Sequence, residues 1–434
     1  MAAGGCGYSA STQKARSALD ANNPKAALAE YNKLLGVESE KEAVRDLSGD
    51  HALHVLERST ILQQLEEYEL SSRDFEAADK QVEMLDFEHG TADDIGRYLY
   101  SDDTGPYRAP AYEKVLINTL NMTNYLVRKD LSGARVEARR LAVMQKFLSE
   151  HEQTDHAWVG PGSYLAGFVF EQSGSFDEAL TFYEEAAAHG LPRELAPQVI
   201  RLADRIGKKS SVIEELRKSV PAAPASEGSG ELLVVVSYGR VPAKIARRIP
   251  IGLALTLVAN DISPSNRARA NELAAQGLVT WINYPEFPKP KPVRETAAVT
   301  IDKGRQESIT AVYNIDSFAV ESWQRGKGAM IASAITRLIA RTGVGLGVGY
   351  AAKKATGNSL LGTLFSLGAQ ATMSGLDTPD TRSWATLPAR IGVYRVTLPA
   401  GKHSVSVWSQ GIPVERSLTI PANGYQVINV TVLR

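Results

Sequence analysis

The chain has 434 residues, of which 44% are apolar and 22% are charged. This length exceeds what one hydrophobic core normally serves, so we expect two or three domains. The 48 basic and 49 acidic side chains leave a formal net charge of -1, which excludes a strong overall attraction to nucleic acid or to an anionic surface.

Residues 1–10 contain the single cysteine, Cys6, within "MAAGGCGYSA". Small residues before a cysteine are typical of the end of a bacterial lipoprotein signal, in which the cysteine carries the lipid. Ala3 stands where that motif more often has Leu, and the five residues before Cys6 include no basic or apolar signal region. We expect a lipid on Cys6 and an outer-membrane lipoprotein. An exposed, unstructured thiol is the alternative.

Residues 11–219 have the long amphipathic patterns of helices. A sequence motif recurs in 20–35, 71–85, 127–141 and 171–186. It consists of a polar turn, a small Ala and a large apolar residue four positions after that Ala. The fourth copy resembles a tetratricopeptide repeat, whose small and aromatic positions are matched by Gly167, Phe170, Gly174, Ala179, Tyr183 and Ala186. The copies lie about 45 to 57 residues apart instead of roughly 34. We therefore expect an irregular helical-repeat array, with a plain bundle of helix pairs as the alternative.

The stretch 102–141 is the most distinctive part of this region. Together with "DTRSWATLPARIGVYRVTLPAGKH" at 380–403, it is similar to a family of uncharacterised bacterial envelope lipoproteins. The matching residues of the first stretch are Gly105, Tyr107, Tyr112, Glu113, Lys114, Val115, Leu116, Asn124, Tyr125, Arg135, Glu137, Arg139 and Arg140. The resemblance implies a helical N-terminal region, a C-terminal β domain and an envelope location, and it implies no particular activity.

Tyr107, Tyr112, Tyr125 and Arg139 are the residues of this stretch most suited to a contact surface. Tyrosine and arginine are enriched at protein interfaces. We expect these four residues to contact a partner or to join two domains. The alternative is that the tyrosines belong to the local core.

Residues 220–231, "VPAAPASEGSGE", have no apolar periodicity and predict a linker. Strand patterns follow at 231–238, 277–285, 296–301, 308–315, 390–398, 403–409 and 425–433. "DKG" at 302–304 is a hairpin signal between two of them. We predict that 232–315 and 377–434 form a β-sandwich domain, which makes the whole chain an α+β multidomain protein.

Residues 316–376 are predicted to be a Gly/Ala-rich helical hairpin inserted into that β domain. The glycines of "TGVGLGVGYAAKKATG" do not fit a nucleotide-binding loop, because such a loop follows a strand and the preceding run is helical. Small residues four apart let helix backbones come close. The predicted helix-packing seam comprises Gly343, Gly347, Ala351 and Ala355, with Gly345 and Gly349 as a second pair.

Three arrangements of this insertion stay open: a hairpin packed on the β domain, a self-association element, and a membrane-inserting hairpin formed by 327–376. The basic loops that contain Arg247, Arg248, Lys289, Lys291 and Arg294 are expected to be solvated. Contact with lipid headgroups or an anionic polymer is the alternative for these loops.

No pattern in the sequence indicates catalytic residues, a cofactor or a small-molecule substrate. His51 and His54 are three apart on a predicted helix but have no third ligand nearby in sequence, and His151 and His156 stand beside acidic residues. We expect polar surface at both places and no metal.

We therefore expect a non-enzymatic cell-envelope lipoprotein that acts as a protein–protein assembly scaffold. Its expected partners are other envelope proteins or copies of itself, and we expect it to reach the membrane through the lipid and, in the membrane-inserting arrangement, also through the 327–376 hairpin. Two alternatives stay open. One is an oligomeric outer-membrane pore or collar built from that hairpin, and the other is a cell-wall-associated binding or regulatory protein.

Overall fold

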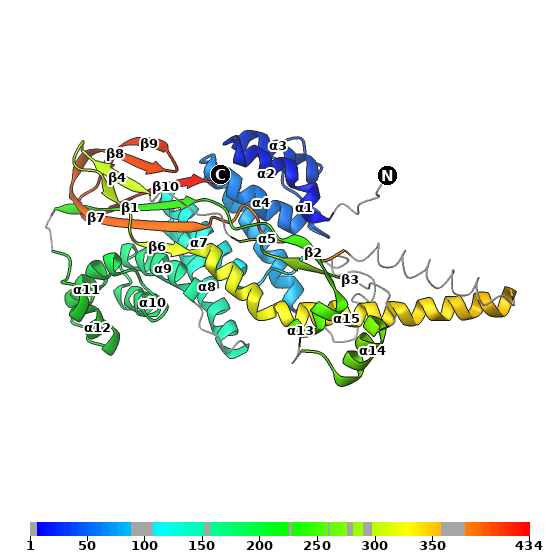
Figure 1. The fold of residues 1–434 in the computed structure, drawn as a ribbon. Coiled ribbons are helices and arrows are strands. Elements are labelled where there is room, and N and C mark those ends of the chain that lie inside the picture. Colours follow the sequence, from blue (N-terminus) through cyan, green and yellow to red (C-terminus); the bar gives the residue numbers. More distant parts are fainter. Residues whose placement is uncertain are drawn as a thin grey trace.

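The computed structural model describes residues 7–87, 107–151, 157–224, 228–258, 261–275, 281–289, 297–356 and 378–434. It confirms the predicted α+β class, since helices occupy most of the N-terminal part and most strands lie toward the C-terminus. Figure 1 shows the helical array, the two four-stranded sheets at one end of it, and one long helix that projects from the other end.

The helical array is built from consecutive helices that contact each other in pairs: α2 with α3, α4 with α5, α7 with α8, α9 with α10, and α11 with α12. The bounds of the helices are α1 (Tyr8–Ser11), α2 (Gln13–Asp20), α3 (Pro24–Leu34), α4 (His51–Gln64), α5 (Tyr68–Phe87), α7 (Ala111–Val127), α8 (Leu131–His151), α9 (Gly160–Gln172), α10 (Phe176–Ala188), α11 (Ala196–Arg205) and α12 (Ser211–Ser219). Two 3₁₀ turns, Ala157–Val159 and Arg193–Leu195, precede α9 and α11.

Four of these pairs share one turn geometry. Asn22, Glu66, Lys129 and Gly174 all have positive φ, and each stands two positions before the second helix of its pair. The repeated motifs at 20–35, 127–141 and 171–186 therefore mark the turn and the start of a second helix. In the motif at 71–85 the turn was misplaced, because Ser71 already lies inside α5.

The α9–α10 pair confirms the role assigned to the small and aromatic positions. Ala179 and Tyr183 are fully buried. A Cβ atom on Gly167 would lie 2.5 Å from the Tyr183 ring, which is closer than van der Waals contact allows. Gly167 is therefore required for the close approach of α9 to the aromatic side chain of α10.

The strands form two four-stranded sheets and a separate two-stranded one. Their orders are β10-β1-β7-β6, β5-β4-β8-β9 and β2-β3. The bounds are β1 (Ser229–Tyr238), β2 (Ile245–Pro250), β3 (Trp281–Glu286), β4 (Ala298–Ile301), β5 (Glu307–Ser308), β6 (Val312–Asn314), β7 (Arg390–Pro399), β8 (Gly401–Ser409), β9 (Ile412–Ile420) and β10 (Tyr425–Val432). β1 pairs with β10 in parallel and with β7 antiparallel.

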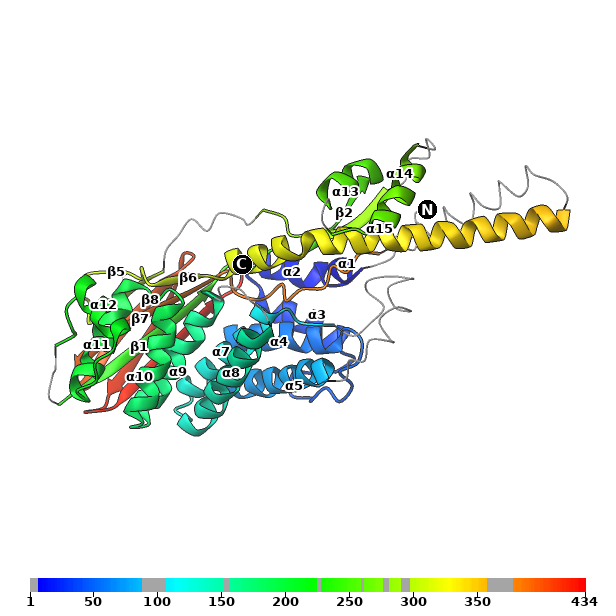
Figure 2. The same cartoon turned by 90° about the horizontal axis from the view of Figure 1, so that it is seen from below.

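The central strand β1 is buried on both faces, as its continuous apolar sequence predicts. Leu232, Val234 and Val236 share a core with Val405 and Val407 of the other four-stranded sheet. The alternate residues Leu233 and Val235 belong to the core of the helical array. The order of layers is thus helices, sheet, sheet, and Figure 2 shows α9, α10 and α11 lying across β1 and β7.

Several boundaries differ from those predicted. The linker ends earlier than residue 231, because β1 begins at Ser229. β2, β9 and the helices α13 (Ile251–Leu257) and α14 (Pro264–Ala275) were not predicted. Residues 378–389 were assigned to the β domain but lie against the helical array, as described below.

Candidate functional site

The most distinctive element of the fold is α15 (Ile315–Thr356), a single helix of 42 residues. Strand β6 leads directly into it. The backbone N–H groups of Ile315 and Asp316 donate to the carbonyl oxygen of Ala389 at 2.9 and 3.3 Å, and the Asp316 carboxylate pairs with Arg390. The first turn of α15 is therefore fixed to the chain that enters β7.

The next turns of α15 are held by residues 245–287, which we call the β2–β3 unit. Its β3, α13 and α14 all contact α15. The Trp323 indole N–H donates to the Pro285 carbonyl at 3.2 Å, and the Phe287 ring packs edge-on against it at 6.4 Å. Ile331 and Ile335, further along α15, are fully buried.

Beyond this contact the helix continues away from the body. Figures 1 and 2 show that α15 passes α13 and α14 and then projects past them. Gly343, Gly345, Gly347, Gly349, Ala351 and Ala355 all lie on this helical part, as predicted. The contacts of their positions, and the second half of the predicted hairpin at 357–376, lie outside the residues whose surroundings the structure describes.

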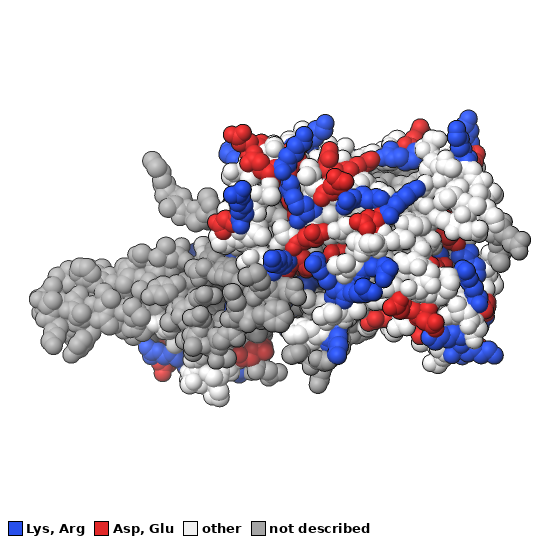
Figure 3. Space-filling view, turned by 180° about the vertical axis from the view of Figure 1, so that it is seen from behind, with Lys and Arg blue, Asp and Glu red and all other residues white. Residues whose placement is uncertain are grey.

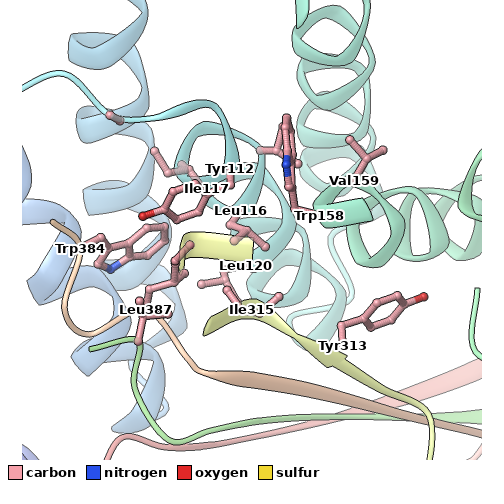
Figure 4. Close-up of a cluster of buried hydrophobic side chains, with 14 of the residues drawn as sticks. Tyr112, Leu116, Ile117, Leu120, Trp158, Val159, Tyr313, Ile315, Trp384 and Leu387 are labelled. Carbon is pink, nitrogen blue, oxygen red and sulfur yellow. The ribbon is translucent and has the colours of Figure 1, made fainter. Parts of the chain in front are cut away.

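Residues 378–389 lead into β7 and include a turn at Ala385 and Thr386, where the Leu387 N–H donates to the Trp384 carbonyl at 3.3 Å. We call them the return segment. Its Trp384 is fully buried, and its indole N–H donates to Thr60 on α4 at 3.0 Å. Figure 4 shows Trp384 and Leu387 beside Leu116 and Leu120 of α7, close to Ile315 at the start of α15. The start of α15 at Ile315 and the segment 378–389 that precedes β7 therefore both pack on the helical array.

Two buried glutamates hold the backbone of the return segment. Glu57 on α4 accepts from the N–H groups of Ala385 at 2.8 Å and Thr386 at 2.7 Å, and Glu113 on α7 accepts from the Trp384 N–H at 3.2 Å. Burial raises the pKa of both carboxyl groups, while these hydrogen bonds act in the opposite direction. Within the molecule, the array thus binds the backbone of a turn through two carboxylates.

Tyr107 and Tyr112 are placed behind this contact and are buried. Both hydroxyl groups donate to Glu113, the bond from Tyr112 measuring 3.0 Å. Their enclosed rings offer no surface to an external partner, which leaves the other two predicted roles, a contact between two regions and a place in the local core. They orient a carboxylate that joins α7 to the return segment.

Tyr125 and Arg139 lie elsewhere and are not brought together with that pair. The Tyr125 hydroxyl donates to Glu76 of α5, and its ring lies against Gly133 of α8. Arg139 is exposed on α8. Arg139 is exposed and Tyr125 is half-buried, so the predicted partner contact stays a prediction for these two residues.

A hollow of about 860 Å³ lies between α9, α11 and the sheet. Glu171, Arg201 and Glu231 line it, and these charges are used within the molecule. Arg201 pairs with Glu231, and the buried Arg395 lies 2.6 Å from Glu231 and 2.9 Å from Glu171. The charged lining of the hollow is therefore explained by ion pairs that connect the helical array to the sheet.

Groups of three or more His, Cys, Asp or Glu side chains with metal-binding geometry do not occur among the described residues. Of the histidines, His54 is buried instead of lying on a polar surface. Basic and acidic side chains are interspersed over the body of the face in Figure 3, which agrees with the near-zero net charge.

No protein-family model, curated protein or solved structure matches this chain. Among the described helices, none is long and apolar enough to cross a membrane. The family resemblance and the envelope location therefore stay predictions, and the site has to be interpreted from its own geometry.

Sequence reasoning predicted a strand at 277–285, where β3 lies, but missed β2, α13 and α14 of the β2–β3 unit, although one signal for α14 was present. Ser263 followed by Pro264 is a helix start, and the Ser263 hydroxyl accepts from the Asn266 N–H at 3.3 Å. The pairing of Glu57 with the return segment left no comparable signal, because the partners lie more than 300 residues apart.

Proposed function

We propose that the protein is a non-enzymatic scaffold of the bacterial cell envelope that presents the distal part of α15, residues 341–356, to copies of itself or to other envelope proteins. The observation that carries the proposal is the continuity of α15. Its base is fixed by β6, the β2–β3 unit and the return segment, and the helix continues for a further four turns.

The small residues of the distal part support a helix–helix contact. Glycine costs up to about 1 kcal/mol relative to alanine inside a helix. Four glycines within Gly343–Gly349 therefore weaken the helix unless close packing against another backbone compensates. Because this part projects beyond the β2–β3 unit, a second copy of the same helix is a suitable partner.

The position of α1 supports a membrane-proximal location. Tyr8 is buried and donates to Glu57 at 3.3 Å, so the chain is attached to the helical body at this residue. A lipid on Cys6 would hold the body on about 7 Å of chain. The scaffold would then stand directly on the membrane surface, with no long tether.

Gly343→Ala combined with Gly347→Ala tests the contact. Alanine raises intrinsic helicity, so a loss of association cannot be caused by a loss of helix. We expect the dissociation constant of the self-associated protein to rise about tenfold, measured by sedimentation equilibrium in plain buffer and in detergent. Gly326→Ala is the matched control, because its added Cβ meets only Met330 at an ordinary 3.6 Å.

Two results would contradict the proposal: a wild-type chain that is monomeric in both media, or a double variant that associates as tightly as the control. Association that exists only in detergent and accompanies dye release from vesicles would favour the pore alternative. Retention on purified peptidoglycan, with no self-association, would favour the cell-wall-binding alternative.

A further inference from the structure

Three of the large apolar side chains that are exposed in the described part of the chain gather on the β2–β3 unit. Leu253 is 51% exposed, Leu257 is 45% exposed and Trp281 is 38% exposed. Trp281 pairs with Pro250 across β2 and β3, and α13 begins at the next residue after Pro250. The two leucines lie one helical turn apart on α13, and Leu253 follows Pro250, the residue paired with Trp281, by three positions.

A basic group accompanies this apolar surface. The guanidinium of Arg248 lies over the Trp281 ring, 5.3 Å from its centre. The opposite side of α13 is anchored, because Ile251 and Ala254 are buried in the core. The inward side of α13 is apolar and fixes its orientation, and Leu253 and Leu257 are apolar residues on its outward side.

The surface lies at the end of the molecule where the chain begins and α15 leaves. The Ser9 N–H of α1 donates to Thr381 at 3.4 Å, and Lys244 donates to the carbonyl of Arg382 at 3.1 Å. β2 begins at the residue after Lys244. Figures 1 and 2 show α1, the β2–β3 unit and α15 at this end, with β8 and β9 at the opposite end.

We propose that Leu253, Leu257, Trp281 and Arg248 form a contact surface for an anionic lipid bilayer. Tryptophan favours the headgroup region because its ring is apolar and its N–H is polar. Leucines one turn apart can enter the upper acyl region, and an arginine that stacks on the tryptophan can bind a lipid phosphate. The contact requires neither a lipid on Cys6 nor self-association through α15, so its failure and the failure of the proposed function are distinguishable.

The first test locates the tryptophan. The full chain, produced without lipid, is mixed with vesicles of phosphatidylcholine and phosphatidylglycerol whose acyl chains carry bromine, which quenches nearby indoles. We expect quenching in the wild type and its loss in Trp281→Phe. Trp408→Phe is the matched control, because Trp408 is 41% exposed on β8 at the opposite end, and this variant should be quenched as the wild type is.

The second test measures affinity by vesicle flotation. Leu253→Gln with Leu257→Gln should weaken partition about tenfold, because apolar area no longer leaves water. Val143→Gln with Phe147→Gln is the control, since these residues are also exposed and one turn apart, on α8. Added salt should weaken binding of the wild type, since it screens the attraction of Arg248 to the anionic headgroups.

Equal quenching of Trp281→Phe and wild type would overturn the proposal, even if the vesicles bind through another part of the chain. Unchanged flotation of the leucine variant would overturn it too. If the leucine variant instead turned a dimer into a monomer in vesicle-free buffer, the surface would be a contact between two copies and the lipid assignment would be wrong.

Discussion

His54 is a buried residue with an unusual environment. Its ring stacks on Tyr8 at 5.2 Å, and neither ring nitrogen has a hydrogen-bond partner within the described structure. Burial lowers the pKa of His54 to about 4, and the nearby His51 acts in the same direction. The folded protein thus holds this imidazole neutral, whereas the unfolded chain takes up a proton near pH 6.5.

We predict that His54→Phe flattens the acid side of the stability curve. Because the folded pKa lies below the unfolded one, the wild type loses stability as the pH falls from 6.5 to 4, by about 3 kcal/mol in total. Phe cannot take up the proton, so the variant lacks this loss. Urea denaturation at a series of pH values measures it, and parallel curves for the two proteins would refute the assignment.

Glu57 illustrates what sequence could not predict about single residues. It lies in "HVLERSTILQQ", where runs of polar or charged residues follow pairs of apolar ones. This pattern predicts a helix with one solvent-exposed face, on which Glu57 would lie. In the structure both faces of α4 are covered, one by neighbouring helices and the other by the return segment, so Glu57, Arg58 and Thr60 are all buried. The return segment, which covers the second face, is distant in the chain, and no local sequence pattern can indicate such a contact.

At the scale of elements, the helix pairs depend on close approach at small residues. Gly167 faces the ring of Tyr183, and Gly162 faces Thr119 and Leu141 in the same way. A methyl group at either position would have to displace a buried side chain. These glycines were recognisable in sequence only in the copy that resembles a known repeat.

We predict that Gly167→Ala destabilises the protein by about 1–3 kcal/mol, because the added methyl group overpacks the α9–α10 contact. Gly252→Ala serves as the control, since a Cβ atom there meets no atom within 4 Å and α13 gains helicity. Urea titrations of both variants give the comparison. Equal midpoints would show that α9 and α10 can separate without cost.

The strands were predicted where apolar residues dominate and were missed where they do not. β1, β4, β7, β8 and β10 have continuous or alternating apolar patterns. β9 contains Pro413 and two charged residues, which suggest a turn, yet proline is compatible with an edge strand and β9 lies at the edge of its sheet. β2 is largely exposed, so its sequence carries little of the apolar pattern.

At the scale of the whole molecule, Arg395 joins the array to the sheet. Its side chain is fully enclosed and pairs with Glu171 from α9 and Glu231 from β1. Burial alone would raise the pKa of Glu231, but Arg395 and Arg201 outweigh it and hold that pKa below its usual value. The order of the regions was predictable from sequence, whereas this joint and the path of the return segment were not, because both depend on pairs far apart in the chain.

We predict that Arg395→Met lowers stability by about 3–5 kcal/mol, because the two largely buried carboxylates of Glu171 and Glu231 then share only Arg201. Arg217→Met is the control, because Arg217 pairs with Asp204 at the surface, and it should leave the melting temperature unchanged. Differential scanning calorimetry measures both variants. Equal melting of Arg395→Met and the wild type would mean that apolar packing alone joins array and sheet.

The parallel pairing of β1 with β10 also determines when β1 can pair fully during synthesis of the chain. β1 is complete at Tyr238, but β10 begins only at Tyr425, so about 190 residues must be made between them. At ribosomal rates of about 5–20 residues per second this takes roughly 10 to 40 s. For that interval a strand that is apolar on both faces has an empty edge, although the helices that cover one face are already made. The newly made protein therefore depends on protection of this edge until β10 emerges.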